Sequence, residues 1–333
     1  MRTEVRGDDA DAAGRGDTVS AAGLGEPHGG PGGTQVGRAP RMPTGAIYDR
    51  GYRHYDGVRE GRWRLVKALT LAGLRRALGL KRSWKAKVVP WGLLAIAFAP
   101  VVAFIGIRVV AGDSVAQFIG YDRYLRVVSV LLLLFSATAG PELLCPDRQS
   151  NVLALYFTRP LRRADYLVAK TAALLVVMAL IALLPMVVLF CGNTLTAPRA
   201  VDYLGDHLFD VARILLTGAM LTVFYSSVAL AVASLGERRS IAVAVLLGTF
   251  LVSNAVITIV FFTTDLPGRR WLTLLALPQL VDRFVDWVFS EPPAPGSMAA
   301  QAGFTGPVYL VALLVVTAAA GALLSWRIAR LRA

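Results

Sequence analysis

LVAKTAALLVVMALIALLPMVVLF, residues 167–190, shows most directly what kind of chain this is. After Lys170, the stretch carries no charged residue over its remaining 20 positions. An α-helix rises about 1.5 Å per residue, so about 20 apolar residues cross the roughly 30 Å hydrocarbon core of a bilayer. The stretch therefore predicts a transmembrane helix.

Five further stretches of the same kind lie on either side of it. Together with 167–190, the predicted spans are 88–110, 125–144, 209–234, 240–262 and 307–328. The whole chain agrees with this interpretation, since 55% of its 333 residues are hydrophobic and only 17% are charged, where soluble domains have about 25% charged residues. We expect an all-α integral membrane protein with six transmembrane helices.

The residues before the first span form two predicted parts. Residues 1–46 are rich in Gly, Asp, Ala and Pro without apolar periodicity, which predicts a disordered cytosolic tail. Residues 47–87 are predicted to form a cytosolic or interfacial segment, with an amphipathic helix over 60–87. The six-span domain, residues 88–333, follows this segment. The apolar face of that helix comprises Val66, Leu69, Gly73, Ala77, Leu80 and Trp84, whereas Arg76 strays towards this face.

The distribution of charge predicts the orientation. The net charge is +13, and nine Lys or Arg residues without an acid fill 62–87. Because this run leads into the first span, membrane lipids are the favoured partner rather than nucleic acid. The 145–166 connection, the 235–239 turn and the C-terminal end are also basic, whereas the other loops hold most of the acids. Both termini should therefore be cytosolic.

The spans lack the groups that an ion-coupled carrier or an enzyme needs. Their centres are uncharged, and the chain contains no phosphate-binding loop and no catalytic or metal-binding motif. We therefore expect no enzyme activity, cofactor or metal site. Cys145 and Cys191 should lie at opposite faces, too far apart for a disulfide. The small residues Ala244 and Gly248 are spaced for close helix packing.

The connection between the second and third spans, GPELLCPDRQSNVLALYFTRPLRRADYLVAK (140–170), has an unusual composition for a loop. Pro146 and Asp147 can begin a short helix, and Pro160 ends it, because proline cannot continue the hydrogen-bond ladder. Val152, Leu155 and Tyr156 are then available to a partner. Asp165 can cap the helix that follows.

This connection resembles the segment that ABC transporter permeases of the second (ABC-2, exporter-like) type carry after their second span. Residues 52–62, YRHYDGVREGR, also resemble the N-terminal stretch of actinobacterial members. The chain departs from the family pattern at Asp147-Arg148, where many members have Glu-Arg, and at Ser150-Asn151, where they have Gly-Thr. The matching positions are Glu142, Asp147, Arg148, Val152 to Phe157 (with Leu155 and Tyr156), Arg159, Pro160, Arg162, Arg163, Tyr166 and Lys170.

The resemblance implies a cytosolic coupling helix between spans 2 and 3 that docks on a separate ABC ATPase subunit. It also implies an amphipathic elbow helix before the first span and short outer helices between spans 5 and 6. Six spans are half of the usual twelve, so a second permease subunit, identical or related, should pair with this one. We expect a permease subunit of an ATP-driven exporter in the cell membrane. The alternative is an accessory or scaffold membrane protein without a transport path.

Overall fold

The computed structural model describes residues 61–80, 84–111, 121–150, 161–197, 199–264 and 267–330. The chain divides into two units, 1–57 and 58–333, and the description below concerns the second. The predicted tail (1–46) and most of the predicted coupling helix (residues 151–160) lie outside the described residues.

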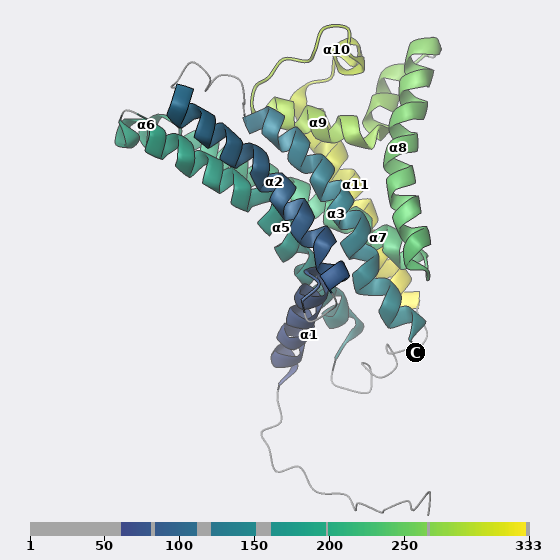
Figure 1. Cartoon of the computed structure of the whole chain (residues 1–333). Coiled ribbons are helices and arrows are strands. Elements are labelled where there is room, and N and C mark those ends of the chain that lie inside the picture. Colours follow the sequence, from purple (N-terminus) through teal and green to yellow (C-terminus); the bar gives the residue numbers. More distant parts are fainter. Residues whose placement is uncertain are drawn as a thin grey trace, which may run out of the picture. The chain divides into compact units, whose positions relative to one another are not determined.

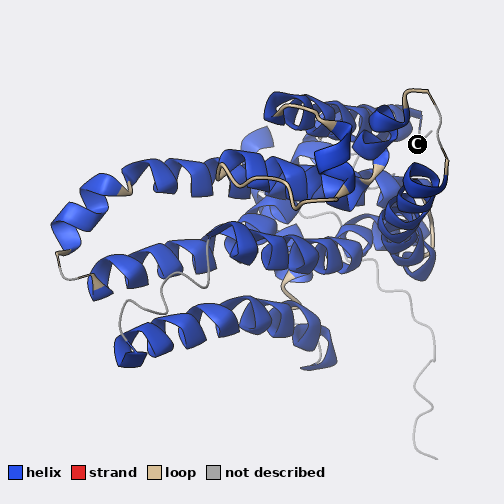
Figure 2. Ribbon diagram, turned by 90° about the horizontal axis from the view of Figure 1, so that it is seen from above, coloured by secondary structure: helices blue, strands red, loops and turns tan. Residues whose placement is uncertain are grey.

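The described residues form helices and loops and contain no strand (Figure 2). In chain order the helices are α1 (Arg62–Ala77), α2 (Trp84–Ala111), α3 (Tyr121–Gln149), α5 (Arg163–Thr196), α6 (Ala200–Asp206), α7 (Leu208–Leu235), α8 (Arg239–Thr263), the 3-10 helix η2 (Arg269–Leu275), α9 (Leu277–Val288), α10 (Met298–Ala302) and α11 (Gly306–Arg330). Six of them, α2, α3, α5, α7, α8 and α11, are long and apolar enough to cross a membrane. The prediction of an all-α membrane protein with six spans is confirmed, and the short helices expected before the last span are η2, α9 and α10.

The end of the second span differs from the prediction. A new helix was expected to begin at Pro146 and Asp147, but α3 continues through Pro141 and Pro146 to Gln149. A proline removes one hydrogen bond and crowds the preceding turn, so other contacts must hold this part of α3. Ser150 donates both its N–H (3.1 Å) and its hydroxyl group to the Pro146 carbonyl, which completes the last turn.

The amphipathic helix is shorter than predicted. It was expected over 60–87, but α1 ends at Ala77 and Trp84 already belongs to α2. The Gly79 N–H bonds to the Arg76 carbonyl and the Leu80 N–H to the Arg75 carbonyl, with Gly79 at a φ of +66°. This is the Schellman arrangement that ends many helices at a glycine. It stops α1 before residues 81–87 can join it.

The apolar face of α1 packs on the protein itself. Val66, Leu69, Gly73 and Ala77 share one face, as the sequence predicts, but this face is buried against other helices rather than placed on the lipid surface, and Leu80 and Trp84 are exposed. The main neighbour of α1 is α5, followed by α3. A Cβ atom at Gly73 would lie 2.9 Å from the Cβ of Ala173 on α5, so glycine is needed for this close approach.

The spans divide into central and peripheral helices. α3 and α7 are mostly buried, and α7 contacts α3, α5 and α11. At the crossing of α3 and α7, Gly140 lies against Ala229. In contrast, few residues of α2, α8 and α11 are buried. The predicted close packing at Gly248 on α8 is wrong within this chain, because a Cβ there would have no atom within 4 Å.

The helix termini gather at two ends of the spans (Figure 1). One end, here called the basic end, holds α1, the end of α3, the start of α5, the α7–α8 turn and the end of α11. The opposite end holds α6, α9 and α10. Cys145 is buried near the basic end and Cys191 is exposed near the opposite end of α5; both are free cysteines.

The orientation can be tested with an impermeant thiol reagent on intact cells. Because positively charged segments stay in the cytosol, we expect Cys191 to react. Ser240, exposed beside the α7–α8 turn, is the matched position at the basic end, because Ser240→Cys is nearly isosteric. In a Cys191→Ser background, Ser240→Cys should react only after the membrane is permeabilised. If Ser240→Cys reacts in intact cells, the basic end faces the outside and the predicted orientation is wrong.

Candidate functional site

Asp147 joins three helices at the basic end. This residue of α3 is 2% exposed. Its Oδ1 accepts a hydrogen bond from the Arg76 guanidinium of α1 at 2.8 Å, and its Oδ2 lies 2.6 Å from Nζ of Lys170 on α5. The Tyr166 hydroxyl donates to the same Oδ2 at 3.2 Å. The carboxylate therefore has partners on both neighbouring helices.

Lys170 is equally enclosed. It is 2% exposed, and besides Asp147 its ammonium group donates to the Leu143 carbonyl of α3 at 3.0 Å. A buried charge is tolerated only when it is paired and hydrogen-bonded. Lys170 meets both conditions with groups of α3, so the first turns of α5 and the last turns of α3 are fixed to each other.

A second ion pair attaches the start of α1 to α5. Nε of Arg62 donates to Oδ2 of Asp165 at 2.7 Å, and a second guanidinium nitrogen donates to Oδ1. Two parallel bonds of this kind fix the orientation of the two groups. Asp165 also accepts the backbone N–H of Arg162 at 2.9 Å. It therefore caps α5, as the sequence predicts.

The end of α3 is also bound to the α7–α8 turn. The Arg148 guanidinium donates to the carbonyls of Ser234 (2.6 Å) and Gly236 (3.1 Å), and the Gln149 amide donates to the Glu237 carbonyl (2.9 Å). Glu142 forms an ion pair with Arg239, the first residue of α8. These contacts satisfy carbonyl groups that the end of α7 leaves without helical partners. They also hold α3 straight beyond Pro146.

Arg163 connects α5 to the last span. Its guanidinium donates to the Ala329 carbonyl of α11 at 2.7 Å. The contacts of Arg62, Arg76, Glu142, Asp147, Arg148, Arg163, Asp165, Tyr166 and Lys170 are here called the basic-end network. It joins α1, α3, α5, the α7–α8 turn and α11 around the two points where residues 151–160 leave and re-enter the described structure.

The predicted coupling residues fall into two groups. The structure brings together Glu142, Asp147, Arg148, Arg162, Arg163 and Lys170 at the basic end. Val152, Leu155, Tyr156, Arg159 and Pro160 lie outside the described residues. The sequence interpretation missed Arg62 and Arg76, which it assigned to the lipid surface. The sequence did hold one signal for Arg76, which is a charged residue close to the apolar face of α1. Because that face packs on α5 and α3, the charge there needs a partner on one of these helices.

The basic-end network predicts that loss of a buried ion pair lowers the free energy of unfolding much more than loss of an exposed ion pair. Removing one partner of a buried pair leaves an uncompensated charge, which costs about 3–5 kcal/mol. Lys170→Met should therefore lower the free energy of unfolding by about 3 kcal/mol, measured by thermal unfolding in detergent. The matched control is Arg213→Met, because Arg213 pairs with Asp210 near the surface and exposed pairs contribute about 0–1 kcal/mol. Equal effects of the two changes would contradict the assigned role of Lys170.

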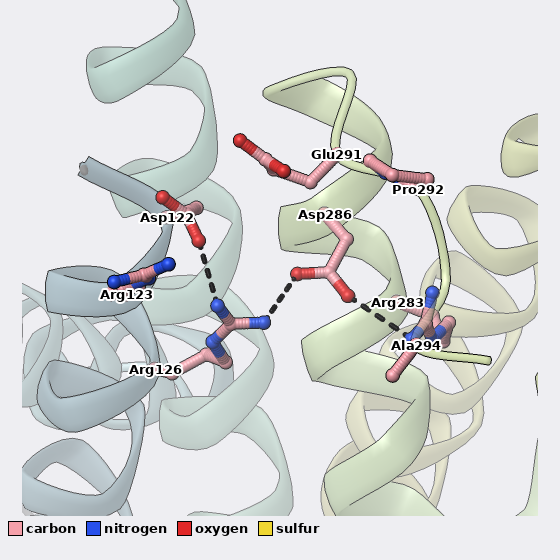
Figure 3. A pocket seen from close by; sticks show the side chains of 8 residues that line it. All are labelled: Asp122, Arg123, Arg126, Arg283, Asp286, Glu291, Pro292 and Ala294. Atoms are coloured by element: carbon pink, nitrogen blue, oxygen red, sulfur yellow. Dashed lines mark hydrogen bonds and ion pairs between the residues drawn. The ribbon is translucent and has the colours of Figure 1, made fainter. Parts of the chain in front are cut away.

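A different set of charges lies at the opposite end (Figure 3). Arg126 of α3 donates to Asp122 on its own helix at 2.7 Å and to Asp286 of α9 at 2.8 Å. Arg283 approaches Asp286 from the other side at 3.3 Å. Arg126 therefore ties α9 to the start of α3 beside a cavity of about 280 Å³.

The carboxylates of α9 titrate above their ordinary range. Burial, followed by the charge of Asp286, raises the pKa of Asp282 to about 6. Burial is also the main cause that raises the pKa of Asp286, although Arg126 and Arg283 act against it. A raised carboxyl pKa means that the folded state binds the proton more tightly than the unfolded chain does. The charged form of Asp282 is therefore unfavourable in the fold.

Asp282 should make stability pH-dependent. The favourable contribution of Asp282 to the free energy of unfolding is complete below about 3.9, the pKa of the group in the unfolded chain. This contribution is lost as pH rises through about 6, the pKa of Asp282 in the folded protein. Asp282→Asn, which cannot ionise, should raise the melting temperature at pH 8 and leave it nearly unchanged at pH 4. Thermal unfolding of both proteins at the two pH values measures this. If Asp282→Asn does not raise the melting temperature at pH 8, Asp282 lies in a polar environment in which its charged form is not unfavourable.

Comparison of the sequence with models of known protein families and with curated proteins finds no match. The proposal for function therefore depends on the basic-end network, the six spans and the sequence of the 140–170 connection.

Proposed function

We propose that this chain is the membrane-spanning permease subunit of an ATP-driven ABC exporter, and that residues 151–160 couple it to a separate ATPase subunit. The observation that carries the proposal is the basic-end network, because it fixes both flanks of this segment. On one flank, Arg148 and Gln149 are bonded to the α7–α8 turn. On the other, Leu161 is buried against Val66 and Leu69 of α1.

Such an arrangement suits the transmission of a displacement. A force on residues 151–160 reaches α3 and α5 at once, since Asp147 and Lys170 are joined and buried. It reaches α1 through Arg76 and the α7–α8 turn through Arg148. Closely packed elements move as units rather than deform continuously. A flexible loop between two independent spans would dissipate the same displacement.

The proposal also assigns the remaining parts of the transporter. ATP hydrolysis belongs to the partner, because the sequence contains no phosphate-binding loop. A second permease subunit is proposed to cover part of α2, α8 and α11, whose apolar faces are exposed and include the open position Gly248. The chain then lies in the cell membrane with both termini in the cytosol, as the basic end favours.

The test is a pair of charges introduced into the coupling segment. Leu155→Asp combined with Tyr156→Asp should leave the permease in the membrane at normal levels, because exposed substitutions cost within about 0.5 kcal/mol. The complex should suffer more, since a buried interface anchor contributes roughly 2 kcal/mol or more. We expect loss of the copurified ATPase and of substrate-stimulated ATP turnover.

Arg162→Ala combined with Arg163→Ala is the matched control in the same connection. These arginines lie at the start of α5, and Arg163 binds α11, so the ATPase should still copurify. If the Leu155 and Tyr156 variant keeps its ATPase at wild-type stoichiometry, coupling does not pass through this segment. If no ATPase copurifies with the wild-type protein, an accessory or scaffold role replaces the proposal.

A further inference from the structure

A second, smaller cavity of about 130 Å³ lies at the opposite end, between α9, α10 and the start of α11. Three aromatic side chains line it: Trp287 of α9, Phe304 of the loop before α11, and Tyr309 of α11. Liquid water takes about 30 Å³ per molecule, so the cavity has room for a small group of a few heavy atoms. Figure 3 shows Arg283, Asp286 and Glu291, which line both this cavity and its larger neighbour.

The aromatic side chains pack on one another and on the backbone at the start of α11. The Phe304 and Tyr309 rings meet edge to face, 6.3 Å apart. A Cβ atom at Gly306 would lie 1.8 Å from the Trp287 ring, so the indole packs directly on the backbone at the start of α11. These contacts place the three rings around the cavity.

The charges of the cavity leave one negative group unmatched. Arg283 is paired with Asp286, and Asp286 also binds Arg126. Among the described residues, the Glu291 carboxylate has no ion-pair partner, and this residue is exposed at the cavity mouth.

Aromatic faces attract cations. The Phe304 ring already has the Arg270 guanidinium 5.8 Å from its centroid. The Trp287 and Tyr309 rings, with the Glu291 carboxylate beside them, are therefore the groups that remain for a ligand cation. This combination favours a positively charged ligand.

One polar atom in the cavity wall has no partner. Tyr309 is 4% exposed, and its hydroxyl group forms no hydrogen bond with any described residue. A buried hydroxyl group without a hydrogen-bond partner destabilises the fold. A ligand that carries a hydrogen-bonding group next to its charge would remove this destabilisation.

We propose that this cavity binds a small ammonium ligand of the choline type, with the charged nitrogen between the aromatic rings and Glu291 and its hydroxyl group at Tyr309. Free choline and the choline headgroup of a lipid share the quaternary ammonium group. The lipid offers Tyr309 a phosphate-ester oxygen in place of the hydroxyl group, and either oxygen can accept a hydrogen bond from the Tyr309 hydroxyl. The proposal concerns the opposite end of the spans and does not depend on the proposed function.

The experiment measures binding to the full-length protein in nanodiscs of phosphatidylglycerol, which lacks a choline headgroup. Choline should bind at least about tenfold more tightly than its neutral isostere 3,3-dimethylbutan-1-ol, because only choline carries the charge that the rings and Glu291 attract. Repetition in phosphatidylcholine nanodiscs distinguishes the two sources. Weaker apparent binding of free choline there assigns the site to lipid headgroups, and unchanged binding assigns it to free ligands.

Three variants separate the parts of the site. Glu291→Gln should weaken the binding of choline and of tetramethylammonium by about tenfold. Tyr309→Phe should weaken choline by about fivefold but not tetramethylammonium, which has no hydroxyl group. Glu237→Gln, an exposed change in the α7–α8 turn, is the control and should alter neither. The proposal is overturned if choline binds no better than the neutral isostere, or if Glu291→Gln leaves both affinities unchanged.

Discussion

The ion pair between Asp147 and Lys170 is the interaction on which the basic end of this protein depends. Each group is buried on a different span, and each compensates the buried charge of the other. In addition to Lys170, the Asp147 carboxylate accepts hydrogen bonds from the Arg76 guanidinium and the Tyr166 hydroxyl group. The contact between α3 and α5 therefore also provides a partner for α1, in addition to the Arg62–Asp165 pair and the packing of Gly73 on Ala173. These contacts explain how so short a helix can be fixed at the end of a membrane domain.

The two ends of the spans use charge in different ways. At the basic end, the ion pairs join helices that are distant in sequence, and carbonyl groups at helix ends take up the remaining arginine donors. At the opposite end, Arg126 is shared between Asp122 and Asp286, and the neighbouring carboxylates have raised pKa values because burial exceeds the compensation. The ion pairs of the basic end therefore join helices, whereas the opposite end keeps a carboxyl group, Asp282, that titrates near pH 6.

The spans and the loop chemistry were predictable to different degrees from the sequence. Hydropathy identifies the six spans because the bilayer requires a minimum apolar length, and this requirement is local. Asp165 was recognised as a cap for the same reason, since a cap acts on its own helix. The continuation of α3 through Pro146 was not predictable, because it is held by residues at and beside the α7–α8 turn, 86 to 97 positions later in the chain. The partners of Arg62 and Arg76 also lie 103 and 71 residues away.

The long separation of Arg62 from Asp165 also has a consequence in time. Chains are synthesised at about 5–20 residues per second, so α1 emerges roughly 5–20 s before the residues that receive it, given the 103 positions between the two partners. During that interval its apolar face has no α5 to cover it. Its arginines and lysines meanwhile suit an anionic membrane surface. The order of synthesis therefore leaves the lipid surface as the environment that suits α1 until α5 is made.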